Sequence, residues 1–185
     1  RRAMAITSYA LGTAQRARTR CDDAIVAFER AVALFKALGE RAKAAIALNR
    51  LGETHYERRD YESAAEAHAR DLRLCELLDD AVGEARALNN LALAHIGAQA
   101  FDEAEKCLRR ALPLWRKLKD AHGQAMTLWG RAQLRYEQDA VDAAIADAEE
   151  ARGIFEQQDA PEADAVRKWL AAIKRGKRTG LRRYF

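Results

Sequence analysis

The chain repeats one pattern of residues every 40 positions, four times within its 185 residues. Small residues recur at this interval in one register, and alanine recurs in a second. The first register holds Gly12, Gly52, Ala92 and Ala132, and the second holds Ala24, Ala64, Ala104 and Ala144. A fixed period of about 20–50 residues is typical of a solenoid, in which each unit buries its apolar face only against its neighbours. The period therefore predicts a stack of repeats, and it favours a binding surface over an active site.

Each repeat contains two stretches of helical periodicity. In residues 85–96, and again in 101–115, apolar residues recur three and four positions apart, as on the buried side of a helix. Asp80 and Asp120 stand where a side-chain oxygen can cap the following helix, and Gly97 suits a left-handed C-cap. The predicted helices span residues 3–17, 21–38, 41–57, 61–78, 81–97, 101–118, 121–137, 141–158 and 162–175.

Spaced small residues predict close contact between neighbouring helices, because a leucine in their place would overpack the contact by about 1–3 kcal/mol. Two positions depart from the pattern. Asp71 stands where the other second helices have alanine, which predicts looser packing in the second repeat. Arg131 stands where the other first helices have leucine, which predicts that the fourth repeat lies near an end of the stack. After it, Val166, Trp169 and Ile173 share one face of a predicted cap helix.

The segments ALNNLALAHIGAQAFDEAEKCLRRALPL (87–114) and ALNRLGETHYERRDYESAAEAHARDLRL (47–74) resemble the tetratricopeptide repeat. Their 40-residue length is similar to the long-helix subtype of kinesin light chains, Pins-type scaffolds and bacterial regulators. The resemblance implies an all-α, right-handed superhelical α-solenoid of four helix-turn-helix repeats plus a C-terminal capping helix. It implies one domain over residues 1–175, followed by a basic tail or linker at 176–185. The repeats span about 5–40, 45–80, 85–120 and 125–160.

In tetratricopeptide folds, the first helix of each unit lines a groove that binds a protein or peptide segment. The resemblance implies that asparagine amides there bind a peptide backbone, arginines pair with carboxylates, and aromatic residues hold side chains. The implied groove residues are Tyr9, Asn49, Arg50, Tyr56, Arg86, Asn89, Asn90, Trp129, Gln133 and Tyr136. Three alternatives stay open: the amides bond neighbouring helices, Glu53 satisfies Arg50 within its own helix, and some aromatic residues serve packing alone.

The remaining motifs give no indication of catalysis. HExxH, GxSxG and phosphate-binding glycine loops are absent from the sequence, so no enzymatic activity and no cofactor are expected. His55 and His95 are one repeat apart, which indicates packing between helices and not a metal site. No stretch approaches the roughly 20 apolar residues that a membrane span needs. The three widely spaced cysteines predict a reducing, cytoplasmic compartment without disulfides.

The sequence thus predicts a scaffold module whose partner is another protein or peptide segment. An alternative is a regulatory or sensor domain of a larger bacterial signalling protein or transcription regulator, which binds its own chain. Self-association through residues 1–20 also stays open. The tail KRGKRTGLRRYF (174–185) is basic but lacks interleaved aromatic residues, so nucleic acid is not the expected partner. The basic clamp of chaperone-binding relatives is not reproduced, so a chaperone-tail receptor is not expected either.

Overall fold

The computed structural model describes residues 1–176, which form nine α-helices and no strand. The predicted helices agree with the observed ones to within one residue at each end, so the all-α prediction is confirmed. The proposed tail at 176–185 lies almost entirely outside the described residues. The helices are α1 (Arg2–Ala17), α2 (Cys21–Ala37), α3 (Arg41–Glu57), α4 (Tyr61–Leu77), α5 (Ala81–Gly97), α6 (Phe101–Leu118), α7 (Ala121–Glu137), α8 (Val141–Gln157) and α9 (Glu162–Lys174).

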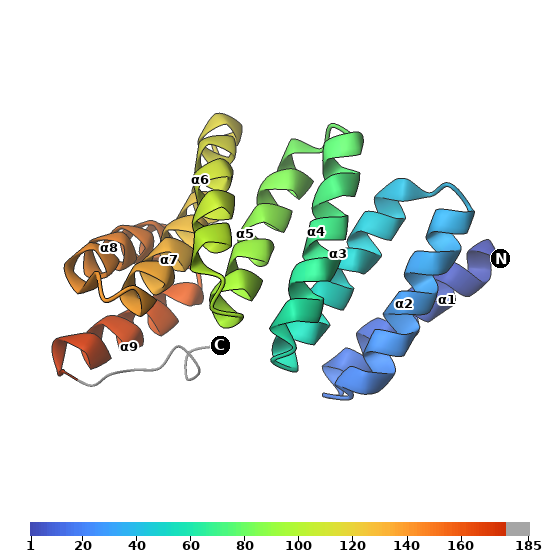
Figure 1. Ribbon diagram of the computed structural model, residues 1–185, viewed down its shortest axis with the longest axis horizontal. Coiled ribbons are helices and arrows are strands. Elements are labelled where there is room, and N and C mark those ends of the chain that lie inside the picture. The colour runs from blue at the N-terminus through green and yellow to red at the C-terminus, as the bar shows by residue number, and fades with distance from the viewer. Residues whose placement is uncertain (177–185) are drawn as a thin grey trace. The chain divides into compact units, whose positions relative to one another are not determined.

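The chain divides into two compact units, Arg1–Cys107 and Leu108–Phe185, and the boundary falls inside α6. In the first unit, α1 to α5 pack in sequence order, each against the next (Figure 1). The first helices α1, α3 and α5 are also neighbours of one another. In the second unit, α7 packs on α8 and α8 on α9. This alternation of first and second helices is what the 40-residue period predicts.

A single left-handed residue closes each turn between consecutive helices of the described chain. The eight residues have φ between 50° and 72° and follow one another at intervals of 20 positions: Thr19, Gly39, Arg59, Asp79, Gln99, Lys119, Asp139 and Asp159. Seven of them carry a side chain, although a left-handed conformation disfavours a Cβ by about 1–2 kcal/mol.

The prediction that Gly97 forms a left-handed C-cap is wrong, because the left-handed residue of that turn is Gln99. Gly97 is instead the last residue of α5. A Cβ at Gly97 would collide with the ring of Tyr61. The glycine therefore leaves room for a neighbouring ring and does not serve the turn. The two predicted aspartate caps are confirmed: Asp80 accepts from the Gly83 amide and Asp120 from the Gly123 amide, at 2.9 and 2.8 Å.

Glycines of the first helices make room for rings of the second helices. A Cβ on Gly12 of α1 would lie 2.8 Å from the nearest ring carbon of Phe28, on α2. A Cβ on Gly52 of α3 would lie 2.6 Å from the ring of His68, on α4. The alanines of the second register, at positions 24, 64, 104 and 144, have no exposed surface. Close packing at the small residues is therefore confirmed, and in these two repeats an aromatic ring fills the space.

The departure at Asp71 is a buried ion pair between α4 and α5. Asp71 has no exposed surface and accepts a hydrogen bond from Nη2 of Arg86 at 3.3 Å. The Cys75 thiol donates to its other oxygen at 3.5 Å. Burial raises the pKa of Asp71, and the nearby guanidinium of Arg86 opposes that shift. The carboxylate thus takes part in the contact between the second and third repeats.

The departure at Arg131 is compensated by an acid on the paired helix. Arg131 donates to both oxygens of Asp147, from Nε at 2.8 Å and Nη2 at 2.7 Å, and Arg135 adds a third bond at 2.6 Å. Asp147 is only 4% exposed. It occupies the position that alanine or cysteine holds in the other three repeats. Two exchanges, leucine to arginine and small residue to aspartate, therefore replace an apolar contact by a charged one.

Helix α9 continues the register of the first helices, because Trp169 and Ala172 follow Trp129 and Ala132 by 40 residues. The indole of Trp169 is fully buried and meets the ring of Trp129 edge to face at 5.0 Å. The ring of Tyr136 lies 5.4 Å from the same indole. The apolar side of α9 therefore packs on α7 and α8, as the prediction of a cap helix requires.

Replacing Gly12 by alanine is expected to lower the free energy of unfolding by about 1–3 kcal/mol, because the new Cβ would overlap the buried ring of Phe28. The gain in helix propensity, at most about 1 kcal/mol, is smaller. Gly153 is the matched control, since nothing in the described structure lies within 4 Å of its Cβ position, and Gly153→Ala should stabilise. Urea denaturation followed by circular dichroism measures both changes. A stabilising Gly12→Ala substitution would contradict this account of the contact.

Replacing Asp147 by alanine is expected to destabilise the protein by about 2–4 kcal/mol, because Arg131 and Arg135 lose a buried partner. The double variant Arg131→Leu with Asp147→Ala restores the residue types of the other repeats. We expect it to regain most of the loss, since the apolar contact replaces the ion pair. Thermal unfolding of the three proteins measures the effect. Equal losses in the single and double variants would show that the two positions are not coupled.

Candidate functional site

The candidate site lies on the surface that α1, α3 and α5 share in the first unit. Residues three and four positions apart on a helix face the same side, and the repeat brings equivalent positions of the three helices together. We call this surface the first-helix face. It consists of Tyr9, Arg16, Asn49, Arg50, Glu53, Tyr56, Glu57, Asn90 and Leu93.

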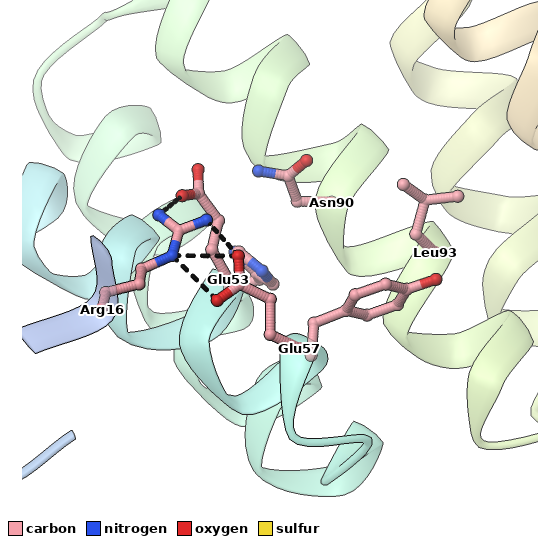
Figure 2. A pocket seen from close by; sticks show the side chains of 7 residues that line it. Arg16, Glu53, Glu57, Asn90 and Leu93 are labelled. Atoms are coloured by element: carbon pink, nitrogen blue, oxygen red, sulfur yellow. Dashed lines mark hydrogen bonds and ion pairs between the residues drawn. The ribbon is translucent and has the colours of Figure 1, made fainter. Parts of the chain in front are cut away.

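A pocket of about 130 Å³ opens on the first-helix face. At roughly 30 Å³ for each water molecule, this volume suits a few waters or one small side chain, and it is too small for a cofactor. Figure 2 shows Arg16 reaching from one side toward Glu53 and Glu57, with Asn90 and Leu93 on the opposite side. The residues that line the pocket are Arg16, Glu53, Tyr56, Glu57, His68, Asn90 and Leu93.

Arg16 joins α1 to α3 through two carboxylates. Its Nε lies 3.0 Å from both oxygens of Glu57, its Nη2 lies 2.6 Å from one of them, and its Nη1 donates to Glu53. Hydrogen bonding to Glu57 raises the pKa of Arg16, against the effect of burial. The sequence analysis did not select Glu57. Its separation of 41 positions from Arg16, one repeat plus one residue, is the signal that predicts their proximity.

Glu53 is the centre of the polar network on this face. Besides the bond from Arg16, it accepts hydrogen bonds from Nη1 of Arg50 at 2.9 Å and from Nδ2 of Asn49 at 2.7 Å. Burial acts to raise the pKa of Glu53, but the guanidinium groups of Arg50 and Arg16 outweigh it and hold the pKa below its usual value. The interpretation that Glu53 satisfies Arg50 within its helix agrees with this contact. Two cations thus share one carboxylate.

The asparagine amides form a chain of hydrogen bonds from α5 to α3. Nδ2 of Asn90 donates to Oδ1 of Asn49 at 2.9 Å, and Asn49 in turn donates to Glu53. Asn49 is 6% exposed, so its amide serves this network between neighbouring helices. Asn90 is half-buried and borders the pocket, and its carbonyl oxygen accepts no hydrogen bond from the described residues. Asn90 therefore retains a capacity to bind that Asn49 has spent.

Other predicted residues of the first unit take part in internal contacts. Tyr9 packs edge to face on the ring of Phe28 at 5.8 Å, and hydrogen bonding to Tyr9 raises the pKa of Arg50. Tyr56 is half-buried, and burial together with the neighbouring Tyr61 raises its pKa to about 12. Arg86 is paired with the buried Asp71, and Asn89 is 8% exposed.

The structure places the predicted residues of the fourth repeat in the interior of the second unit. Trp129 is 5% exposed and Gln133 is 1% exposed, and Tyr136 lies against the buried indole of Trp169. None of the three lines the pocket of the first unit. The 40-residue offset between Trp129 and Trp169 is the signal that predicts this burial, because it places α9 beside α7 in the position of a further first helix.

His68 forms the inner boundary of the pocket from α4. It is 2% exposed, and its Nδ1 has no hydrogen-bond partner among the described side chains and backbone. Burial lowers the pKa of His68 to about 4, while the Glu53 carboxylate opposes this shift and Arg86 supports it. The ring is therefore neutral near pH 7. It presents one nitrogen to a ligand or a water as a neutral donor or acceptor, depending on its tautomer.

The described residues contain no group of three or more histidine, cysteine, aspartate or glutamate side chains placed to hold a metal ion. The three cysteines are free thiols, and burial raises the pKa of Cys75 to about 12, which keeps it protonated near pH 7. Within the part of the chain that the structure describes, no helix is long and apolar enough to cross a bilayer.

The helices and the first-helix face define an all-α repeat solenoid, a class that uses such extended surfaces for binding. The profile of the tetratricopeptide repeat matches residues 3–76 and 83–157. The chain belongs to the tetratricopeptide repeat family. No curated protein matches the sequence at a significant level.

Several solved structures share the fold at low sequence identity. The apo form of RapI superposes with a TM-score of 0.82 at 17% identity, over 92% of this chain and 62% of RapI. A Rap protein complexed with Competence and Sporulation Factor gives 0.82 at 16% identity, over 94% of this chain and 49% of that one. Aspartyl phosphate phosphatase F from Bacillus subtilis gives 0.78 at 11% identity, over 91% and 44%. The chain therefore spans between 44% and 62% of the length of these three proteins.

The buried His68 predicts a loss of stability in mild acid. Its pKa is about 4 in the folded protein and about 6.5 in the unfolded chain. The unfolded state thus binds a proton between these values that the folded state does not. The free energy of unfolding should fall by up to about 3 kcal/mol as the pH is lowered through this window.

His68→Phe is the matched control for this pH dependence, because Phe28 occupies the equivalent position over Gly12. It removes the titrating group and keeps a ring against Gly52. Urea denaturation at several pH values between about 4 and 7 should show a smaller decrease for the variant than for the original chain. Parallel decreases in both proteins would mean that other groups cause the pH dependence.

Proposed function

We propose that this chain is a non-catalytic scaffold that binds a protein or peptide segment on the first-helix face, across α1, α3 and α5. The observation that carries the proposal is the chain of hydrogen bonds from Asn90 through Asn49 to Glu53. It fixes the Asn90 amide at the rim of the pocket with its carbonyl oxygen available. A backbone N–H of a bound segment supplies the donor that this oxygen lacks.

The charges and apolar residues of the same face indicate the kind of segment. The cations Arg16 and Arg50 are balanced by the carboxylates of Glu53 and Glu57. A segment of strong single charge would therefore compete with ion pairs already formed. Ile6 and Ile46 lie one helical turn before Tyr9 and Asn49, and they are 50% and 47% exposed. We infer a segment of low net charge with an aliphatic side chain near these isoleucines.

The likeness to solved structures supports this proposal at the level of fold. One of them, a Rap protein, is complexed with Competence and Sporulation Factor, so a solenoid of this kind accommodates a separate factor. We further propose that the repeats act as one domain over residues 1–175. The free cysteines support a reducing, cytoplasmic setting.

A regulatory or sensor domain of a larger bacterial signalling protein or transcription regulator is the second candidate. The observation that favours it is the greater length of the similar structures, of which this chain spans about half. In that case the segment on the first-helix face belongs to the same polypeptide. The face and its hydrogen bonds would be used in the same way.

Selection from a displayed library of unstructured peptides tests the proposal. We expect peptides selected on the full chain to bind at least about tenfold more weakly to Asn90→Ala, because the backbone acceptor is lost. Gln157→Ala is the matched control, since it removes an exposed amide from α8. Isothermal titration calorimetry measures the affinities, and circular dichroism checks that the helices are retained.

Hydrogen exchange locates the bound peptide. Protection of α3 and α5 backbone amides on binding would agree with the first-helix face. Peptides that bind the original chain and both variants equally, with protection elsewhere, would contradict the proposal.

A further inference from the structure

Helix α1 carries a second exposed surface, on a different side from the first-helix face. Met4, Thr7, Leu11 and Ala14 follow one another at helical spacing and define what we call the outer face of α1. All four are exposed, with Met4 at 47% and Leu11 at 50%. The buried residues of α1 are Ala5, Ser8 and Gly12, which face the other way.

The equivalent positions of the next two first helices are covered. In α3 and α5 they contact the preceding second helix, α2 or α4. The repeat thus shapes this register of a first helix to receive another helix, and within residues 1–176 no helix is packed on it in α1. The exposed fractions are 0% for Ala44, 0% for Ala47, 3% for Leu51, 0% for Ala87, 7% for Leu91 and 0% for Ala94.

Positive charge flanks the outer face of α1 at both ends. Arg1 lies one turn before Met4 and Arg18 one turn after Ala14, on the same side of the helix. Neither arginine forms an ion pair with the described residues, whereas Arg2 is paired with Glu40. Residues 1–20 hold five arginines and no acid. An apolar stripe between two unpaired cations fits a helix that carries acids at the matching positions.

The same charges argue against a second copy of the chain as the occupant. Two α1 helices face to face would bring arginine against arginine. Helix α9, which presents the other first-helix register without a following helix in the described chain, exposes Arg167, Lys168, Lys174 and Arg175. Contact between α1 and α9 of another copy is therefore also basic against basic.

We propose that the outer face of α1 docks an amphipathic helix of a partner protein. Small or aliphatic residues of that helix contact Met4 and Leu11, and its acidic residues face Arg1 and Arg18. The partner helix runs antiparallel to α1, as α2 runs to α3. This inference does not depend on the function proposed for the first-helix face.

Fluorescence anisotropy with designed helical peptides tests the inference on the full chain. The first probe is a labelled peptide of about five helical turns, with alanine and leucine along one stripe and glutamate beside it. The second probe has the same stripe with lysine in place of glutamate. We expect the acidic probe to bind, its affinity to fall as salt is raised, and the basic probe to bind at least about tenfold more weakly.

Two substitutions locate the contact. Leu11→Glu should weaken the acidic probe at least about tenfold, since it places a like charge in the stripe. Val26→Glu is the matched control, because Val26 is 66% exposed on α2 and lies away from the outer face of α1. Arg18→Glu should reduce the preference for the acidic probe over the basic one.

The inference is overturned if both probes bind equally well, or if Leu11→Glu and Val26→Glu have the same effect. Sedimentation equilibrium supplies the remaining outcome. A dimer of the original chain that Leu11→Glu dissociates would assign the face to a second copy and overturn the proposed occupant.

Discussion

Small residues at the contact positions allow consecutive helices to approach closely, and the rest of the structure depends on this approach. The alanines of the second register are completely buried, so the helices meet there with little side chain between them. Where the first helix has glycine, the second helix supplies a ring, as Gly12 and Phe28 show. The first helices are thereby held near enough for Arg16 to reach the next repeat. The polar network of the candidate site is thus a consequence of apolar packing.

The sequence predicts the backbone well because four copies of the pattern confirm one another. Helix ends shift by one residue at most, since the repeat fixes where each periodic stretch must stop. The assignment of Gly97 fails for a local reason. Glycine is favoured both in left-handed turns and beneath rings, and a single sequence does not distinguish the two uses. The turn places its left-handed residue two positions later, at Gln99.

The candidate site is less predictable, because periodicity gives the face of a helix but not what covers it. Trp129 and Gln133 occupy groove positions by register, yet α9 follows as a further first helix and the second unit buries both residues. Asn49 was predicted to bind a peptide, but its amide hydrogen-bonds to Asn90 and Glu53. Side-chain contacts between repeats decide such outcomes. Of the site residues, Asn90 keeps the position and the capacity that the sequence predicts for it.

The spacing of the left-handed turn residues separates the geometry of the main chain from the identity of the side chains. Turns recur every 20 residues, whereas the side-chain pattern recurs every 40. The main chain therefore treats inner and outer helices alike, and only composition tells them apart. An insertion or deletion of 20 residues would keep every turn closed while it exchanged the roles of all later helices. Selection on such a gene would thus tolerate length changes in whole pairs of helices and remove those in single ones.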